Sequence, residues 1–369
     1  MLMELGSIPP NLQDTFRYER WLQSGLHSGM AYLASEYHLR ARKDPRVLFP
    51  EVQSILVLSI PYPSPQSRPK PQDGLPHGRI AAYAWTKDYH LAAPAIFKQV
   101  VADLEKDLAM EIHWRGYTDS APILERQMGM QAGLGWIGRN GCLIHPLHGS
   151  YFLLGEIFTD VTPDELAQSS LISRQEQIPD RCGACTRCID ACPAGCILPD
   201  RTIDAGRCIS YLTIENKGVI PRDLRSRMGD WVFGCDICQT VCPWNRKAST
   251  LSADVPQIGI DPYPDLLQQL LLTESDFKTL YHDSPVLRPK RQGWLRNVCV
   301  ALGNAGDPDA VEPLIEVLRS EPEPMIRVHA AWALGRMGTR TAQAALEQAA
   351  NADPDELVRE ECLLSREQA

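Results

Sequence analysis

Apolar residues in the first half of the chain follow strand-like and helix-like patterns. Residues 54–59 and 151–158 are short apolar runs bounded by proline or polar residues, which predicts two buried β-strands. Between them, residues 92–111 carry apolar side chains at helical spacing, and residues 123–132 also fit a helix. This mixture allows an α/β or an α+β domain at the N-terminus. Of the two we predict an α/β domain over residues 1–170, in a chain that is α+β as a whole. The N-terminal segment is short, and the pattern does not place the first strand of this domain.

The C-terminal part of the chain contains an internal repeat. The tripeptide Ala-Leu-Gly at residues 301–303 recurs at residues 333–335, a period of 32 residues, and each copy follows an apolar helical pattern. A helix-turn-helix unit of this length is typical of HEAT-like repeats. We therefore predict an α-helical HEAT-like domain over residues 265–369, which offers a surface to a partner. Proline, serine and aspartate punctuate residues 248–264, which predicts a linker.

Composition indicates an ordinary globular protein. The chain has 369 residues, of which 44% are hydrophobic and 22% charged, enough for two or three domains with their own cores. The first residues contain neither a basic region nor an apolar signal core, and the longest apolar stretch, near residues 54–62, is too short to cross a bilayer. We expect a cytoplasmic protein without a membrane partner.

The distribution of charge leaves a nucleic-acid partner open. A net charge of -9 argues against indiscriminate binding to phosphate backbones. A local basic face on an acidic protein is compatible with this value, as are scattered solvated charges. Basic residues gather in two places: Arg201, Arg207, Lys217, Arg222, Arg225 and Arg227, and then Arg288, Lys290, Arg291 and Arg296.

Cysteine spacing gives the strongest chemical signal. Eight of the twelve cysteines form two sets: Cys182, Cys185, Cys188 and Cys192 before Pro193, and Cys208, Cys235, Cys238 and Cys242 before Pro243. The first set has the spacing C-x2-C-x2-C-x3-C-P of bacterial ferredoxins, in which the fourth cysteine ligates the other cluster. The second run lacks one cysteine of that spacing, and Cys208 supplies it. A ferredoxin-like domain with two 4Fe-4S clusters is therefore predicted over residues 171–250.

The ferredoxin rule assigns every ligand once. One cluster takes Cys182, Cys185, Cys188 and Cys242, and the other takes Cys192, Cys208, Cys235 and Cys238. Structural zinc sites also use C-x2-C pairs, but they separate two such pairs by a longer spacer. A disulfide framework does not suit a long chain without a secretory signal. The remaining cysteines are expected to be small buried hydrophobic residues: Cys142, Cys196, Cys299 and Cys362.

Two weaker motifs lie in the N-terminal domain. Gly133-x-Gly135-x-x-Gly138 matches a dinucleotide fingerprint, but the segment before it fits a helix where the fingerprint needs a strand. These glycines are expected to allow close approach of the backbone to a large planar or phosphate-bearing ligand. Asp88-x-His90 is similar to a cobalt-ligating motif, with Ala93 in place of its glycine. We favour a His90 that is packed or hydrogen-bonded within the domain.

Asp119 precedes the segment 123–132 and allows two interpretations. A carboxyl at the edge of an apolar pocket can be held protonated and act as a general acid. An aspartate just before a helix is also a common N-cap, whose side chain accepts hydrogen bonds from the first backbone amides. On the residues alone we favour the N-cap.

Several motifs in order along the chain resemble those of the epoxyqueuosine reductase family. The resemblance covers most of the chain. Each motif alone occurs in many proteins, but their ordered combination is specific. The matching segments are Arg42-x-Asp44-Pro45, Lys87-Asp88-Tyr89-His90, Asp119-Ser120-Ala121-Pro122 with Glu125-Arg126, residues 132–136, Gly149-Ser150-Tyr151, both cysteine sets, residues 207–212 and 234–239, and the HEAT-like end.

The resemblance implies an enzyme that reduces an epoxide to an alkene with loss of water. Its substrate is epoxyqueuosine at the wobble position of tRNA, its product queuosine. Cobalamin, bound base-off by the N-terminal domain, and two 4Fe-4S clusters would carry the electrons, and Asp119 becomes the proton donor. The implied corrinoid contacts are Arg42, Tyr83, Asp88, Tyr89, His90, Asp119, Arg126, Gly135, Trp136, Leu143, Leu154 and Ser210.

Partners follow from the same resemblance. An external low-potential electron donor is required, and tRNA phosphates are expected near Lys217, Arg288, Lys290, Arg291 and Arg296. Two other classes stay open: a related corrinoid iron-sulfur reductase, such as a reductive dehalogenase, and a non-catalytic electron carrier. Dehalogenases typically have a twin-arginine signal and lack a helical repeat tail. A simple carrier would bind clusters but no corrinoid.

Overall fold

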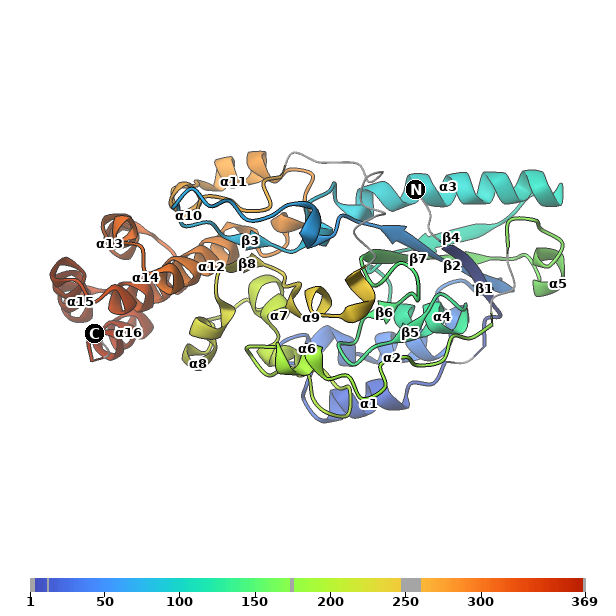
Figure 1. Cartoon of the computed structure of the whole chain (residues 1–369), viewed down its shortest axis with the longest axis horizontal. Coiled ribbons are helices and arrows are strands. Elements are labelled where there is room, and N and C mark those ends of the chain that lie inside the picture. Colours follow the sequence, from blue (N-terminus) through green and yellow to red (C-terminus); the bar gives the residue numbers. More distant parts are fainter. Residues whose placement is uncertain (1–3, 12, 173–175, 247–259, 368–369) are drawn as a thin grey trace. The chain divides into compact units, whose positions relative to one another are not determined.

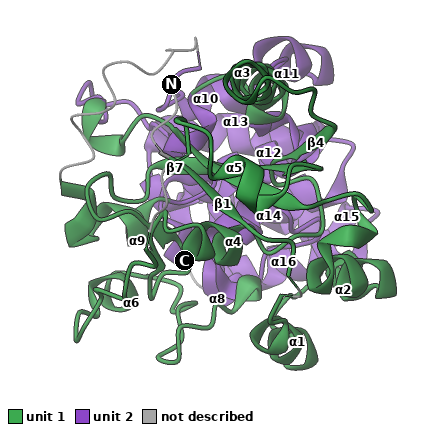
Figure 2. Ribbon diagram, turned by 90° about the vertical axis from the view of Figure 1, so that its right-hand side faces the viewer, with its two compact units in different colours: residues 1–67, 86–206, 236–258 green, residues 68–85, 207–235, 259–369 purple. Residues whose placement is uncertain are grey.

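The structure is a computed structural model that describes residues 4–11, 13–172, 176–246 and 260–367. The chain divides into two compact units, and each unit is built from segments that are not contiguous in sequence (Figure 2). The first unit comprises residues 1–67, 86–206 and 236–258, and the second comprises residues 68–85, 207–235 and 259–369. The predicted domain boundaries at residues 170, 250 and 265 stay predictions.

The first unit is built on a four-stranded antiparallel sheet in the order β1-β2-β7-β4. The central strand β2 pairs Ile55 with Phe158 and Val57 with Glu156 of β7. Nearly all of β2 is buried on both faces, which is why its sequence is continuously apolar and does not alternate. The strands are β1 Glu4–Ile8, β2 Ser54–Pro61, β4 Trp114–Tyr117 and β7 Phe152–Thr159.

Helices cover both faces of this sheet. Helix α3 (Tyr89–Leu108) lies on one face, where Phe97 and Leu104 pack against Leu56 and Ile157. Helix α4 (Glu125–Gln131) covers the other face together with α2 (Glu36–Lys43), as Figure 1 shows. The two predicted strands and both predicted helices are confirmed.

Two expectations for this region need correction. All neighbouring strands of the sheet are antiparallel, so the first unit has an α+β arrangement and not the α/β arrangement predicted for the N-terminal domain. Helix α3 begins three residues before the apolar pattern, because the Asp88 side chain accepts a hydrogen bond from the backbone N–H of His90 and caps the helix. Strand β1, which the sequence did not place, pairs with β2 along its whole length.

The remaining elements of the first unit are short. The glycine-rich segment after α4 leads into a small hairpin of β5 and β6. A side chain at Gly135 would place its Cβ 2.2 Å from the carbonyl oxygen of Ile144, so this glycine permits close contact with the chain's own backbone, and its role as a corrinoid contact stays a prediction. The other elements are α1 Phe16–Gln23, β5 Trp136–Ile137, β6 Leu143–Ile144, α5 Pro163–Leu166, α6 Arg187–Asp190 and α9 Ile237–Thr240.

The second unit consists mainly of helices. A short parallel pair, β3 (Arg79–Ile80) and β8 (Trp231–Phe233), lies beside the first of them. Residues 260–264 belonged to the predicted linker, yet the Pro262 and Pro264 carbonyls accept hydrogen bonds from the segment 78–80. The rest of that linker lies outside the described residues. The helices are α7 Ile209–Ile214, α8 Arg222–Arg225, α10 Leu266–Leu270, α11 Glu274–Leu280, α12 Lys290–Ala305, α13 Val311–Ser320, α14 Pro324–Met337, α15 Arg340–Ala352 and α16 Glu356–Arg366.

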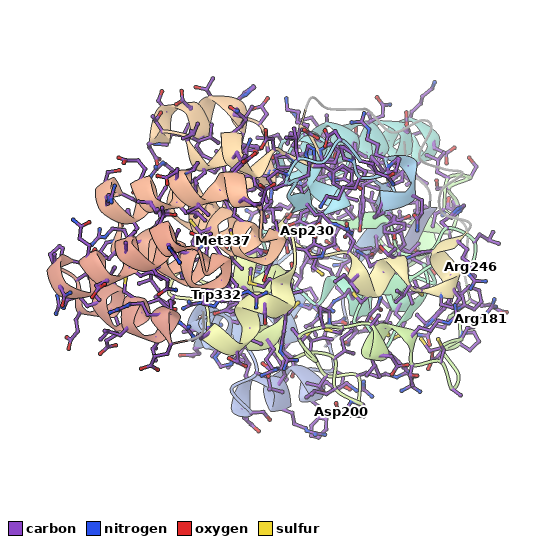
Figure 3. All side chains as sticks on the ribbon, turned by 60° about the vertical axis from the view of Figure 1, so that its left-hand side comes forward. Arg181, Asp200, Asp230, Arg246, Trp332 and Met337 are labelled. Carbon is purple, nitrogen blue, oxygen red and sulfur yellow. The ribbon has the colours of Figure 1, made fainter. Side chains whose placement is uncertain are left out.

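The repeated Ala-Leu-Gly tripeptide marks the packing points of the long helices. Helix α12 packs on α14, and α14 packs on α16. A Cβ at Gly303 would lie 2.8 Å from the ring of Trp332, and a Cβ at Gly335 would lie 2.6 Å from that of Ser365. The small residue lets each helix approach the next closely. Figure 3 labels Trp332, which is buried on α14 with the Arg225 and Arg336 guanidinium groups over its ring.

No helix within the described ranges is long and apolar enough to span a membrane.

Candidate redox and proton-transfer site

Four cysteines of the first unit gather around helices α6 and α9, which pack together. The thiols of Cys182 and Cys242 act electrostatically on Cys188, and those of Cys182 and Cys185 act on Cys242. Burial raises the pKa of the Cys188 and Cys242 thiols. The structure thus brings together the four residues that the ferredoxin rule assigned to one cluster, including one from the second run. These thiols lie near enough to Cys188 or Cys242 to act on them, and four thiolates are the ligand set of a 4Fe-4S cluster.

The other predicted cluster draws on both units. Cys192 and Cys238 belong to the first unit, and Cys208 and Cys235 belong to the second. Their assignment to one cluster stays a prediction. The Sγ atom of Cys192 lies 3.4 Å from that of Cys196.

The cysteines outside the two sets differ in burial. Cys196, Cys299 and Cys362 are buried, as expected for small hydrophobic residues. Cys142 is partly exposed, and its thiol is close enough to Cys242 to act on it electrostatically. Among the described residues, no three His, Cys, Asp or Glu side chains are grouped as ligands of a single metal ion.

A buried polar network fixes the cysteine turns to the sheet of the first unit. Asn245 Oδ1 accepts a hydrogen bond of 2.6 Å from the backbone N–H of Ser150, just before β7. Gln239 Oε1 accepts one of 2.8 Å from the Ser150 hydroxyl and lies within hydrogen-bond distance of Tyr62, just after β2. Buried, satisfied networks of this kind hold a single arrangement. They explain why Gly149-Ser150-Tyr151 and Gln239 belong to the motif set.

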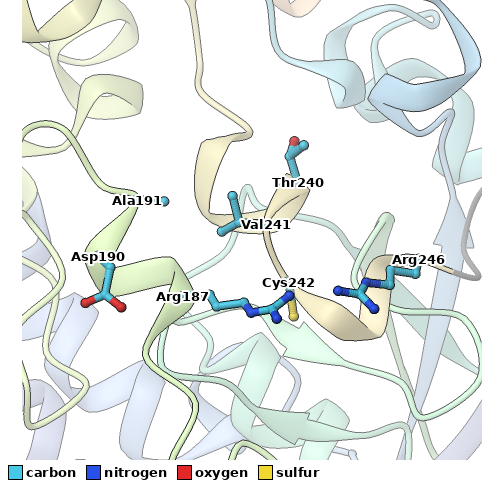
Figure 4. Close-up of a pocket in the computed structure, with 7 residues that line it drawn as sticks. All are labelled: Arg187, Asp190, Ala191, Thr240, Val241, Cys242 and Arg246. Atoms are coloured by element: carbon cyan, nitrogen blue, oxygen red, sulfur yellow. The ribbon is translucent and has the colours of Figure 1, made fainter.

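A cavity of about 540 Å³ opens beside Cys242. Figure 4 shows the Arg187 and Arg246 side chains reaching toward Cys242 from α6 and from the turn after the second cysteine run. Asp190 adds one carboxylate to the lining. The lining of the cavity beside Cys242 therefore carries a net positive charge. The lining residues are Arg187, Asp190, Ala191, Thr240, Val241, Cys242 and Arg246.

Asp119 lies on the loop between β4 and α4 and is exposed. Its Oδ2 accepts a hydrogen bond of 2.7 Å from the Tyr89 hydroxyl, and its backbone N–H donates one of 2.6 Å to Glu125 Oε1. The backbone φ of Asp119 is +51°, a left-handed conformation that is uncommon outside glycine and is found at functional sites. Helix α4 begins at Glu125 without a side-chain cap, so the N-cap interpretation is wrong.

The start of α3 borders this loop. The His90 ring stacks on the Tyr89 ring at 4.2 Å between centroids, and its Nδ1 lies 2.8 Å from Asp88 Oδ1. The expectation that His90 is hydrogen-bonded within the domain is confirmed. Tyr89 thus connects the helix start to the Asp119 carboxylate.

The other predicted corrinoid contacts of the first unit divide into two groups. The Arg42 guanidinium lies over the Tyr18 ring at 4.8 Å, and Arg126 donates to the carbonyl of Gly141. Trp136 and Leu143 are buried in the unit's own core, and Leu154 is half-buried. The Trp136 ring packs against the Trp244 ring in a T-shaped arrangement, and its role as a contact stays a prediction.

These side chains suit a corrinoid in chemistry. The ring is flat and apolar and carries amide groups at its edge. Asp88, Tyr89 and Asp119 provide polar side chains that can meet amides, and Leu154 provides apolar surface. Tyr83, which packs on Phe233, and Ser210 belong to the second unit, and their role as contacts stays a prediction.

Sequence reasoning missed one buried carboxyl near Asp119, and it did not foresee the environment of a second, half-buried one, Glu125. Glu156 lies in the middle of β7 and is fully buried, and burial with the charges of Glu125 and Asp119 raises its pKa well above the usual range. Burial, followed by the charge of Asp119, raises the pKa of Glu125 to about 7. A single carboxyl inside the apolar run Phe-Leu-Leu-Gly-Glu-Ile-Phe was the available signal, because such strands rarely contain one.

The basic residues of the second unit correct part of the tRNA prediction. Arg296 is fully buried, and its guanidinium donates to the carbonyls of Leu212, Asn216 and Gly218. It cannot reach a phosphate at the surface, and burial lowers its pKa to about 10. Arg291 donates through two nitrogens to the Glu321 carboxylate, so its charge is already paired.

Three other predicted tRNA contacts do gather on the surface of the second unit. Lys217, Arg288 and Lys290 are exposed. Partial burial lowers the Lys217 pKa, and Arg288 and Lys290 lower it further because like charges lie close. Glu215 pairs with Arg288 and offsets part of this charge. We call Lys217, Arg288 and Lys290 the basic corner.

Together, the fold and the site define an iron-sulfur protein with a mixed helix-sheet unit and a unit of stacked helical repeats. Family comparisons agree. Three family models match: "4Fe-4S double cluster binding domain" at residues 181–245, "HEAT repeats" at residues 294–365, and "Epoxyqueuosine reductase QueG, DUF1730" at residues 42–120.

Curated relatives specify the family. An epoxyqueuosine reductase of Cyclobacterium marinum is 39% identical over 78% of this chain and 87% of its own length. Those of Pseudomonas aeruginosa and Escherichia coli are 37% and 32% identical, over 91% and 90% of this chain and 89% and 87% of their own lengths. The chain belongs to the epoxyqueuosine reductase family.

Solved structures of the family match the whole chain. An epoxyqueuosine reductase crystallised with an epoxyqueuosine-modified tRNA stem loop aligns with a TM-score of 0.88 at 28% identity, over 100% of this chain and 95% of that chain. The protein from Streptococcus thermophilus aligns with a TM-score of 0.82 at 28% identity, over 99% and 94%. A Bacillus subtilis structure, with a TM-score of 0.86 at 28% identity over 100% and 95%, has a catalytic loop named for an aspartate and swung out of the active site.

Proposed function

We propose that this protein reduces epoxyqueuosine to queuosine at the wobble position of tRNA, the last step of queuosine biosynthesis, in the cytoplasm. Family membership supports the reaction. The observation that carries the site is the Asp119 loop. Its exposed carboxyl accepts a hydrogen bond from Tyr89 and its backbone N–H donates one to Glu125, in the same unit as four neighbouring cysteines. Proton and electron sources therefore share one compact unit.

The reaction breaks both C–O bonds of the epoxide, forms a C=C bond and releases the oxygen as water. It consumes two electrons and two protons. We assign Asp119 as the residue that protonates the departing oxygen, since its carboxyl is exposed and its loop is held on both sides. A positioned acid of this kind typically accelerates a reaction by about 10²–10⁴-fold.

We assign the electron path to two 4Fe-4S clusters and cobalamin. When bound, cobalamin would supply low-potential electrons to the strained C–O bond. Tyr89, His90 and Arg42 would hold it in the first unit, and Cys182, Cys185, Cys188 and Cys242 would hold one cluster. The cysteine turns, fixed by Gln239 and Asn245, would keep that cluster in place.

The basic corner is our candidate for tRNA phosphate contacts. Replacing both Lys217 and Lys290 with alanine should weaken tRNA binding about tenfold at low salt and flatten its salt dependence, because two phosphate contacts are lost. Filter binding of the stem loop across a salt series measures this effect. Unchanged affinity and an unchanged salt slope would remove the basic corner from the interface.

Arg296 provides the contrasting case. Arg296→Ala should lower the free energy of unfolding by about 3 kcal/mol, because three buried carbonyls lose their donor. Urea unfolding, monitored through the loss of helical structure, measures this change in the free energy of unfolding. A variant as stable as the wild type but deficient in tRNA binding would restore Arg296 to the interface.

The cavity beside Cys242 is our candidate for docking of the electron donor. Charge reversal by Arg187→Glu and Arg246→Glu should slow cluster reduction by an acidic carrier such as reduced flavodoxin about tenfold at low salt, through lost electrostatic steering. Reduction by photoreduced deazaflavin, a small neutral molecule, should keep its rate. Equal slowing by both reductants would show damage to the cluster and not to docking.

The proposed function has a direct test. The protein is reconstituted anaerobically with iron, sulfide and cobalamin and incubated with epoxyqueuosine-containing tRNA and a strong reductant, and nucleosides are analysed by mass spectrometry. Cobalamin-dependent loss of one oxygen to give queuosine is the expected result. Bound clusters and cobalamin without conversion would refute the assigned substrate.

A further inference from the structure

Three carboxyls lie at one corner of the first unit, each on a different element. Asp119 is on the loop after β4, Glu125 is the first residue of α4, and Glu156 is in the middle of β7. Glu125 Oε1 accepts the hydrogen bond from the Asp119 backbone N–H at 2.6 Å. The charges of Asp119 and Glu125 both act on Glu156. Exposure decreases along the series, from exposed Asp119 through half-buried Glu125 to fully buried Glu156.

Glu156 is the most deeply buried of the three carboxyls and has no access to solvent. Its side chain is on the same sheet face as Leu154 and Phe158, the face that α4 covers. Val57 of β2 and Tyr117 of β4 are its cross-strand neighbours. Neither carboxyl oxygen has a hydrogen-bond partner among the described residues. An ionised carboxylate without a partner is costly at such a site, so burial favours the neutral form of Glu156 and raises its pKa well above the usual range.

Glu125 is half-buried and lies between the buried sheet face and the solvent. Burial and the charge of Asp119 raise its pKa to about 7, while Arg126 of α4 and Arg42 of α2 oppose the shift. Its pKa therefore lies near neutral pH, where the carboxyl can both take up and release a proton. Once Glu125 has lost that proton, the two arginines stabilise the carboxylate that remains.

The stoichiometry of the proposed reaction exceeds what Asp119 can supply. Water formation from the epoxide oxygen takes two protons in each turnover, and Asp119 holds one. Tyr89, the other side chain bonded to Asp119, is a phenol and a poor proton donor near neutral pH. A second acid within reach of the Asp119 loop would supply the other proton.

On the basis of the proposed function, we propose that Glu125 is a proton-relay residue, which stores the second proton and passes it to Asp119 after Asp119 has protonated the epoxide oxygen. Asp119 then delivers it to complete the water molecule. The proton balance closes with Asp119 and Glu125 both ionised. Two protons from solvent reload them through exposed Asp119 after the product has left. Glu156 remains neutral throughout and keeps the inner face free of water.

Infrared spectroscopy of the full-length protein tests whether Glu125 holds a proton near neutral pH, and it needs no turnover. Below pH 7 the wild type should show two neutral carboxyl bands from this corner. One should disappear as the pH rises through about 7 and be absent in Glu125→Gln. The other should persist to higher pH and be absent in Glu156→Gln. If no band titrating near pH 7 is assignable to Glu125, the proposal is wrong.

Turnover provides the second test. Gln at position 125 keeps an oxygen that can accept the Asp119 N–H, so it removes the proton and preserves the loop. Glu125→Gln should lower queuosine formation about tenfold or more and abolish the fall in wild-type rate as the pH rises through 7. Glu125→Asp, which retains a titratable carboxyl, should recover part of the rate and the pH inflection. If Glu125→Gln fails to fold, Glu125→Asp and the wild-type infrared titration decide.

Two comparison variants make the result specific. Glu165→Gln changes a carboxyl that only caps α5 and should match the wild type. Tyr89→Phe removes the other contact of Asp119 and should keep the inflection near pH 7. Wild-type rate and pH profile in Glu125→Gln would overturn the relay. A wild type that makes no queuosine would instead refute the proposed function, while the infrared titration still reports on Glu125.

Discussion

Asp119→Asn should lower the rate of queuosine formation by about 10²–10⁴-fold and leave cluster content unchanged. Asparagine can still accept the hydrogen bond from Tyr89, and its backbone N–H can still donate to Glu125. The loop therefore keeps both contacts, and only the transferable proton is lost. Single-turnover assays with anaerobically reduced enzyme isolate this step from electron delivery.

A matched aspartate controls for surface charge. Asp164 is exposed in the first turn of α5, in the same unit, and Asp164→Asn should behave as the wild type. Full activity in Asp119→Asn would remove Asp119 from the mechanism. Loss of iron in that variant would instead indicate that the loop supports the cofactors.

Cys242→Ser should remove one cluster and abolish electron delivery. This cysteine comes from the second run but lies among Cys182, Cys185 and Cys188, so its loss leaves that cluster with three thiolates. Iron analysis after reconstitution should show about four fewer iron atoms per chain, and queuosine formation should fall below detection. An unchanged iron content would contradict the crossed ligand assignment.

Cys142→Ser is the matched control for that experiment. Its thiol is near Cys242 and partly exposed, yet it belongs to neither cysteine run. The variant should keep its iron and most of its activity. Iron loss in Cys142→Ser equal to that in Cys242→Ser would indicate that proximity, and not ligation, explains the effect.

Sequence patterns predicted the sheet elements where burial alone decides the residue type. The run at 54–59 became β2 because both faces of that strand are covered. Pattern could not give strand direction, since the antiparallel pairing of β1, β2 and β7 depends on connections far apart in sequence. It also missed the first turn of α3, where capping by Asp88 and not apolar spacing sets the start.

Site residues were predictable where spacing encodes the chemistry. Ferredoxin spacing grouped Cys242 with the first cysteine run, and the structure brings those residues together. Charge gave weaker guidance, because basic residues in one stretch of sequence can have opposite environments. Lys290 is exposed on α12, while Arg296, about two turns later, is buried and bonds to backbone carbonyls. Glu156 was missed because nothing local reveals that a strand carboxyl lies beside two others.

The strand order of the sheet determines how late during translation β2 can pair with β7. Strand β2 ends at residue 61 and its partner β7 begins at residue 152, so 91 residues must be added before the pairing can form. At typical rates of protein synthesis this takes roughly 5 to 18 seconds. During that interval one edge of a continuously apolar strand has no partner, and β1 protects only the other edge. The nascent chain should therefore depend on chaperones most strongly before β7 has been translated, and β7 precedes every cysteine of the iron-sulfur runs in the chain.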